Sequence, residues 1–335
     1  MEQNVIILPY EGNNEEIQEK EVVETPKQDR QWTEYNLYQT QERILAYKII
    51  NDVVNYLQLQ NKPINGRPSV EINDMIKSLL VKSYNNISAR RLNSELIMFK
   101  GLGYIDKVYH FNTILKYLGD PEIVYILEAI MKELSIPMKE LEKYFAIDAT
   151  GFSTLDKKQW KEIRLDFKVH KDYRKLHMIC GVKTNVIVSA YVTEGTCNDS
   201  PYLKPLLDDT TKRFKIEEIS ADAGYLSRDN CDSTRSIGAS PYIMPKKNVT
   251  AQAKGSIAWH EMVSMWKNNL DKFKEHYHKR SNAESTFSMI KRKFGNTLRG
   301  HCDTTKENEI MCKVCCHNIS VLVEAMMLYN AKPHF

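Results

Sequence analysis

The chain has 335 residues, of which 42% are hydrophobic and 27% charged, with a formal net charge of +4 and seven cysteines. This length allows a sizeable core and two domains, but the charge is too small to establish nucleic-acid binding. The sequence predicts neither a signal peptide nor a membrane span, so the odd number of cysteines indicates reduced thiols in a cytoplasmic protein.

Charge is distributed unevenly along the chain. Residues 1–30 carry eight acids and three bases, and their sparse apolar residues predict a flexible acidic leader. Residues 271–300 carry eight bases and three acids. A basic block favours a polyanionic partner, although a solvated helix face has the same composition.

Apolar residues at helical spacing predict a region of short helices up to about residue 145. The expected helices cover residues 35–58, 70–84, 89–99 and 110–118, followed by two that start near Pro121 and Pro137, with a turn at Pro63, Gly66 and Pro68. Tight turns and the pair Arg90 and Arg91 suggest a helix-turn-helix DNA reader, and a plain helical bundle fits the same pattern.

From residue 144 the apolar pattern becomes that of strands. Two short runs each end in an acid, Asp148 and Asp222, and two further runs at 175–182 and 186–193 predict a hairpin. The remaining elements are helices at 200–212 and 226–237, a strand at 241–244, and helices at 277–294 and 306–329.

The helix expected at 277–294 carries Tyr277, Arg280, Glu284 and Lys291 on one face, because their spacings are whole turns at about 3.6 residues per turn. One carboxylate beside two cations suits a metal ion next to a phosphate. The alternative is a capping box, in which Ser281 and Glu284 only start the helix.

These four residues form the pattern Y-x2-R-x3-E-x6-K, so the chain resembles the DDE transposases of bacterial and archaeal insertion sequences. The resemblance covers roughly residues 140–325 and includes AIDATGF around Asp148 and EISADAGYLSRDN around Asp222. It implies an α/β fold of the ribonuclease H-like type, a mixed sheet with flanking helices, together with an all-α N-terminal domain.

The resemblance also implies a catalytic site. Asp148, Asp222 and Glu284 are expected to be catalytic and to hold two Mg²⁺ ions, with Mn²⁺ as an alternative, about 3.5–4 Å apart. Such a centre first cuts DNA with water and then joins a DNA 3′-hydroxyl to target DNA. The residues expected to bind DNA are Tyr277, Arg280, Lys291, Arg292, Lys293, Arg90, Arg91 and Trp266.

Three further side chains have two interpretations each. Asp199 is either one of the acids of such enzymes or, as we favour, the cap of a helix from Ser200. His177 resembles a family position but is expected to be a structural histidine. Arg228 either contacts DNA or is an exposed helix residue.

A tryptophan and a cluster of cysteines also have two interpretations each. Trp266 lies in a small insertion, 245–276, where related transposases place a tryptophan that stacks on a flipped base, and a core position is the simpler interpretation. Cys312, Cys315, Cys316 and His317 suggest zinc, but no second ligand pair is near, so buried helix residues are the favoured reading.

The expected domains are the leader 1–30, a helical DNA-end-binding domain 31–142, and a catalytic domain 143–330. The expected function is transposition by an insertion-sequence enzyme, acting on double-stranded DNA at terminal inverted repeats and at target DNA. The resemblance implies a homodimer in the synaptic complex, a cytoplasmic, nucleoid-associated location and no membrane partner. The alternative is a domesticated, transposase-derived nuclease or DNA-binding regulator.

Overall fold

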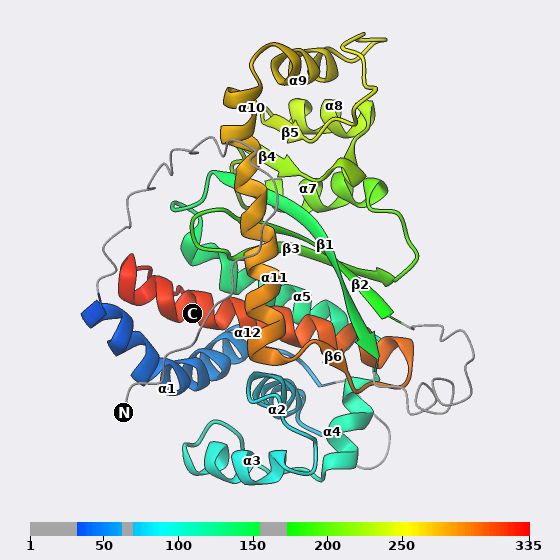
Figure 1. Ribbon diagram of the computed structural model, residues 1–335. Helices are drawn as coiled ribbons and strands as arrows, with labels where there is room; N and C mark the ends of the chain where they lie inside the picture. Colours follow the sequence, from blue (N-terminus) through cyan, green and yellow to red (C-terminus); the bar gives the residue numbers. More distant parts are fainter. Residues whose placement is uncertain (1–31, 62–69, 155–172) are drawn as a thin grey trace, which may run out of the picture.

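The computed structural model describes residues 32–61, 70–154 and 173–335. The predicted acidic leader and the predicted turn at Pro63, Gly66 and Pro68 lie outside these residues. In Figure 1 the early helices form the lower part of the molecule, and a sheet lies above them.

Helices form the first part of the described chain, as the sequence predicts. They are α1 (Trp32–Tyr56), α2 (Ile72–Tyr84), α3 (Leu92–Gly101), α4 (Phe111–Leu118) and α5 (Ile123–Ser135). The helix expected at Pro137 is only the 3-10 turn η1 (Ile136–Met138). Here Met138 O accepts the N–H groups of Leu141 and Glu142, which turns the chain towards the sheet.

A mixed sheet follows, with six strands in the described residues. They are β1 (Tyr144–Thr154), β2 (Tyr173–Gly181), β3 (Ile187–Glu194), β4 (Glu218–Ala221), β5 (Ser240–Ile243) and β6 (Thr297–Leu298). The order is β3-β2-β1-β4-β5, with β6 paired to β1. The hairpin of β2 and β3 is antiparallel, whereas β4 and β5 are parallel to β1. The expected α/β class is therefore confirmed.

The first strand is longer than the sequence predicts. We expected it to end at Asp148, but β1 continues to Thr154 because β2 pairs with it as far as Ser153. Pairing with the parallel strand β4 stops at Ile147. Asp148 therefore lies in the middle of β1, where its parallel neighbour ends, and Asp222 directly follows that neighbour.

The helix expected at 277–294 is interrupted. The later helices are α7 (Leu203–Thr211), α8 (Arg228–Ser236), α9 (Ile257–Asn268), α10 (Leu270–Tyr277), α11 (Ser281–Phe294) and α12 (Asp303–Leu328), with 3-10 turns η2 (Ser200–Tyr202), η3 (Ala223–Tyr225) and η4 (His278–Arg280). Tyr277 ends α10, Arg280 lies in η4, and only Glu284 and Lys291 lie on α11. The four residues thus do not share one continuous α-helix.

Helix α12 is the centre of the core. It contacts α1, α2 and α5 as well as β2 and β3, and Figure 1 shows it crossing between the sheet and the early helices. It is long and apolar enough to cross a membrane, but 83% of its most apolar window is buried inside the protein, as expected for a core helix. One hydrophobic cluster therefore joins the early helices to the sheet, and the boundary near residue 142 stays a prediction.

Candidate active site

Strand β1 presents three residues along the face that α11 covers. Side chains of a strand alternate between faces, so Asp148, Thr150 and Phe152 point the same way. Helix α11 contacts β1, and it runs along the front of the sheet in Figure 1. Lys291 Nζ lies 2.6 Å from Thr150 Oγ1 and 5.4 Å from the centre of the Phe152 ring. The family pattern alone gave no signal for Thr150, whereas strand alternation would have pointed to it.

Arg280 joins two of the predicted acids. Its Nη1 donates to Asp148 Oδ2 at 3.0 Å, and its Nη2 donates to Glu284 Oε1 at 2.6 Å. The Arg280 and Asp148 side chains are only 19% and 18% exposed, whereas Glu284 is 59% exposed. Residues 132 positions apart in sequence thus form one ion-pair network at the sheet.

The alternative capping box is wrong. Helix α11 does begin at Ser281, but no side chain caps it. Ser281 Oγ instead donates to His278 O at 2.8 Å, and the Glu284 carboxylate accepts from Arg280. The carboxylate of Glu284 therefore pairs with the Arg280 side chain rather than with a backbone N–H at the helix start.

Asp222 lies next to Asp148 across the parallel strands. The last register pair of β1 and β4 is Ile147–Ala221, each aspartate directly follows one member of that pair, and neighbouring strands are about 4.8 Å apart. Each aspartate accepts its following backbone N–H with Oδ1, Asp148 at 2.8 Å and Asp222 at 2.7 Å. This bond orients each carboxylate and leaves its second oxygen for another partner.

The pKa of Asp148 depends on burial and on several charged groups at this edge of the sheet. Burial raises the pKa of Asp148, the Ala149 N–H and Arg280 lower it, and the negative charges of Asp222 and Glu284 raise it again. The charges of Asp222 and Glu284 therefore both act on the carboxylate of Asp148.

The donor chemistry at this edge fits a hard divalent cation, because three carboxylates supply oxygen ligands. In the part of the chain that the structure describes, no group of three or more His, Cys, Asp or Glu is gathered as a metal cluster. The positive charge between Asp148 and Glu284 is the guanidinium of Arg280. Asp148 and Glu284 are thus arranged around an arginine.

Asp199 belongs to a neighbouring polar cluster and does not act as the expected cap. Its side chain makes no capping bond to the turn that follows it, because its Oδ1 lies 2.6 Å from Lys175 Nζ. His177 is fully buried, lies 3.0 Å from Thr193 Oγ1 and stacks on Tyr202. Burial lowers the pKa of His177 to about 4, so it is a neutral, structural histidine at neutral pH.

The cations expected to bind DNA differ in their surroundings. Arg91 and Arg292 are exposed, and the exposed guanidinium of Arg90 lies 5.3 Å from the centre of the Phe111 ring. Lys293 is already engaged, since its Nζ pairs with Glu42 of α1 and lies 3.0 Å from Ser320 Oγ of α12. The structure does not gather all of these cations at the acids.

The aromatic candidates are partly buried. Tyr277 stacks on Phe273 with ring centres 6.0 Å apart, and the Arg280 guanidinium lies 5.8 Å from the Tyr277 ring. Burial raises the pKa of the Tyr277 phenol. Trp266 is half-buried and packs against the hydrophobic core.

Arg228 is neither a free surface residue nor placed at the acids. Its Nε donates to Ala253 O and its Nη2 to Gln252 O, both at 3.2 Å. The guanidinium also lies 4.6 Å from the centre of the Trp259 ring. Arg228 therefore fastens the segment before α9 to α8.

The cysteines of α12 are core residues, as favoured from the sequence. Cys312, Cys315 and Cys316 are fully buried, and burial raises the pKa of each thiol. His317 Nε2 lies 2.8 Å from Asn185 O, which ties α12 to the hairpin turn. Among the described residues these side chains form no metal cluster.

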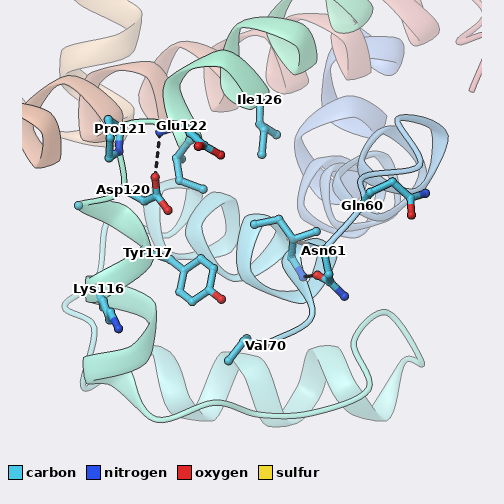
Figure 2. A pocket seen from close by; sticks show the side chains of 12 residues that line it. Gln60, Asn61, Val70, Lys116, Tyr117, Asp120, Pro121, Glu122 and Ile126 are labelled. Atoms are coloured by element: carbon cyan, nitrogen blue, oxygen red, sulfur yellow. Dashed lines mark hydrogen bonds between the residues drawn. The ribbon is translucent and has the colours of Figure 1, made fainter. Parts of the chain in front are cut away.

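A cavity of about 560 Å³ lies away from the acids. It is bounded by the end of α1, the start of α2 and the connection from α4 to α5. Figure 2 shows Tyr117 and Asn61 on its wall, together with the bond from Glu122 N–H to Asp120 that starts α5. None of the predicted site residues lines this cavity.

Comparisons with known proteins identify the family of this chain. The family described as "Transposase DDE domain" matches residues 140–319. A curated protein of Archaeoglobus fulgidus, "Probable transposase for insertion sequence element ISA1214", is 23% identical over 274 residues, which are 81% of this chain and 80% of the relative. No solved structure matches the chain. Transposases of this family act on DNA and generally use divalent metal ions. The match covers more than half of the chain, which therefore belongs to the DDE transposases of insertion sequences.

Proposed function

We propose that this transposase cuts double-stranded DNA at the terminal inverted repeats of its own element and transfers the resulting 3′-hydroxyl to target DNA. The observation that supports the proposal is that Arg280 bridges Asp148 of β1 and Glu284 of α11. Asp222 directly follows the strand that pairs with β1, and Lys291 lies beside Thr150 on the same face of β1. Three acids with two cations form a site that suits a phosphodiester flanked by further phosphates.

The three acids are proposed to hold two Mg²⁺ ions, with Mn²⁺ as an alternative, which when bound would activate the attacking oxygen and steady the leaving one. The backbone bonds of Asp148 and Asp222 fix the direction of their carboxylates before any ligand arrives. The Glu284 side chain is 59% exposed and lies on a helix, so it can adjust to the DNA.

Arg280 and Lys291 are proposed to bind phosphate oxygens on either side of the cut. Arg280 offers a planar set of donors that matches a phosphate, whereas Lys291 offers a point charge. Burial lowers the pKa of Lys291, so a nearby phosphate would restore the stability of its charged form. The Tyr277 ring flanks Arg280, with the guanidinium 5.8 Å from the ring centre.

End recognition is proposed for the helical region 31–142, where Arg90 and Arg91 lie at the start of α3. Arg292 and, after release from Glu42, Lys293 would contact the DNA backbone, and Trp266 a displaced base. A homodimer would hold two element ends in the synaptic complex, in the cytoplasm and associated with the nucleoid.

The test is strand cutting of the element's own ends in Mg²⁺, with the cut positions mapped. Asp148→Ala, Asp222→Ala and Glu284→Ala should each reduce cutting by at least about a hundredfold and leave end binding intact. Glu261→Ala, which removes a half-exposed carboxylate on α9, is the matched control and should cut normally.

An alanine variant of any of the three acids that cuts at the normal rate would contradict the assignment. If the unaltered chain binds its ends and cuts nothing, the domesticated DNA-binding regulator is the better description. Inverted repeats with short target duplications around the gene would favour the mobile element.

A further inference from the structure

We propose that Arg280 is a built-in counter-ion that competes with divalent cations for Asp148 and Glu284 and releases them when DNA phosphate binds. The proposal rests on the metal-dependent function proposed above. It adds a regulatory step, because the DNA-free enzyme would bind metal weakly and the DNA-bound enzyme tightly.

The geometry places the guanidinium in direct competition. Two different nitrogens of Arg280 bind two different carboxylates, at 3.0 Å on Asp148 and 2.6 Å on Glu284. A cation shared by these two acids would compete with the guanidinium for the same two negative charges. Both Arg280 and Asp148 are mostly buried, so water screens their attraction only weakly.

The same contacts leave Arg280 incompletely satisfied. Its buried Nε has no hydrogen-bond partner in the described part of the molecule. A phosphate offers several acceptor oxygens and can bind Nε and an Nη together, which the present pair of carboxylates does not do. Burying a donor without a partner is costly, so DNA phosphate would offer Arg280 a better environment than the acids alone.

The surroundings allow such a movement. Arg280 lies in the 3-10 turn η4, between α10 and α11, rather than inside a long helix. Its partner Glu284 is 59% exposed, so that bond can open into solvent. The Tyr277 ring lies 5.8 Å from the guanidinium and offers a surface along which it can shift.

Thermodynamic linkage then gives the expected behaviour. If DNA removes Arg280 from the acids, DNA tightens metal binding, and metal tightens DNA binding by the same factor. Removing the charge of Arg280 should therefore tighten metal binding even when no DNA is present. The coupling would keep hydrolysis low until an element end is bound.

The experiment is calorimetric titration of the full-length, DNA-free protein with Mg²⁺, repeated with a short duplex that carries no cleavage site. Arg280→Gln should lower the Mg²⁺ dissociation constant about tenfold without DNA. Arg280→Lys, which keeps one charge but cannot bridge both acids, should give a smaller change in the same direction. The duplex should tighten Mg²⁺ binding to the unaltered protein and not to Arg280→Gln.

Two controls separate this proposal from the function on which it rests. Arg235→Gln removes an arginine that pairs with Glu261 elsewhere and should leave Mg²⁺ binding unchanged. Asp222→Asn removes a proposed ligand that Arg280 does not contact and should abolish Mg²⁺ binding. If Asp222→Asn binds Mg²⁺ as the unaltered protein does, the metal site itself is wrong.

The counter-ion role is overturned if Asp222→Asn loses Mg²⁺ binding while Arg280→Gln binds Mg²⁺ no more tightly than the unaltered protein. Circular dichroism will show whether Arg280→Gln folds. If it does not fold, Arg280→Lys decides the question by the same criterion, since it retains a charge beside Asp148.

Discussion

At the scale of single residues, burial determines which side chains of this protein can carry a charge. Asp148 is paired with an arginine, whereas His317 is fully buried and lies 2.8 Å from a backbone carbonyl oxygen, that of Asn185. A buried histidine with such a partner donates its N–H and stays neutral, because no carboxylate of the described residues compensates a charge there. His317 therefore makes the free energy of unfolding depend on pH under acidic conditions.

His317 should make the protein less stable below neutral pH. Burial lowers its pKa to about 4 from an ordinary 6.5, so the unfolded chain takes up the proton first as pH falls. The stability is present above pH 6.5 and is lost between pH 6.5 and 4. From pH 7 to 5 the loss is about 2 kcal/mol. His317→Gln keeps a donor for Asn185 O. In urea denaturation, this variant should lose about 2 kcal/mol less free energy of unfolding between pH 7 and pH 5 than the unaltered protein. An unchanged slope would show that His317 does not titrate in this way.

At the scale of elements, a single asparagine joins α12 to the edge strand β3. Asn318 Oδ1 accepts Ile187 N–H at 2.9 Å, and its Nδ2 donates to Ile187 O at 2.7 Å and to Met131 O at 3.3 Å. The amide thus pairs both backbone groups of Ile187 as a neighbouring strand would. It also connects the strand to the end of α5, which covers it.

Asn318→Ala should lower the free energy of unfolding by about 3 kcal/mol, because it leaves buried backbone groups of Ile187 and Met131 without partners. Urea denaturation monitored by circular dichroism measures the change. Asn55→Ala, at an exposed position of α1, is the control and should stay within about 0.5 kcal/mol. If Asn318→Ala lowers the free energy of unfolding no more than the control does, water takes over the hydrogen bonds of the Asn318 side chain.

At the scale of the whole molecule, the early helices and the sheet share one core. Helices α1, α2 and α5 contact one side of α12, while β2 and β3 contact another, so α12 is buried on nearly all sides. Lys293 adds a polar link from α11 to α1 through Glu42. Cutting the chain at the predicted boundary near residue 142 would expose the apolar surface of α12 to water.

A fragment of residues 143–335 should therefore fail to form a compact native state, because several buried side chains of α12 lose their cover. Near-ultraviolet circular dichroism and binding of a hydrophobic dye would report the loss of fixed packing. A fragment that unfolds cooperatively would argue for two independent domains. End recognition is better tested by Arg90→Ala and Arg91→Ala in the full-length chain.

The strand and helix order was predictable because local periodicity and turn residues follow from neighbouring positions. Nearly all expected helices and strands are present, and the favoured core interpretation of Cys312, Cys315 and Cys316 agrees with their burial. The cap assigned to Asp199 was wrong because Lys175, on the strand β2, competes for its carboxylate. The continuous helix from Tyr277 was wrong because periodicity does not reveal a 3-10 turn at Arg280.

The sequence by itself determined the family and predicted the three acids as catalytic, because the Y-x2-R-x3-E-x6-K pattern and the segments around Asp148 and Asp222 are local features. Only the tertiary structure decided that Asp148 lies inside a long strand, that Arg280 bridges it to Glu284, and that α12 is enclosed by helices from the other end of the chain. Such contacts depend on strand pairing, register and burial between distant segments. The spacing of residues along the chain does not show which charged side chains form ion pairs.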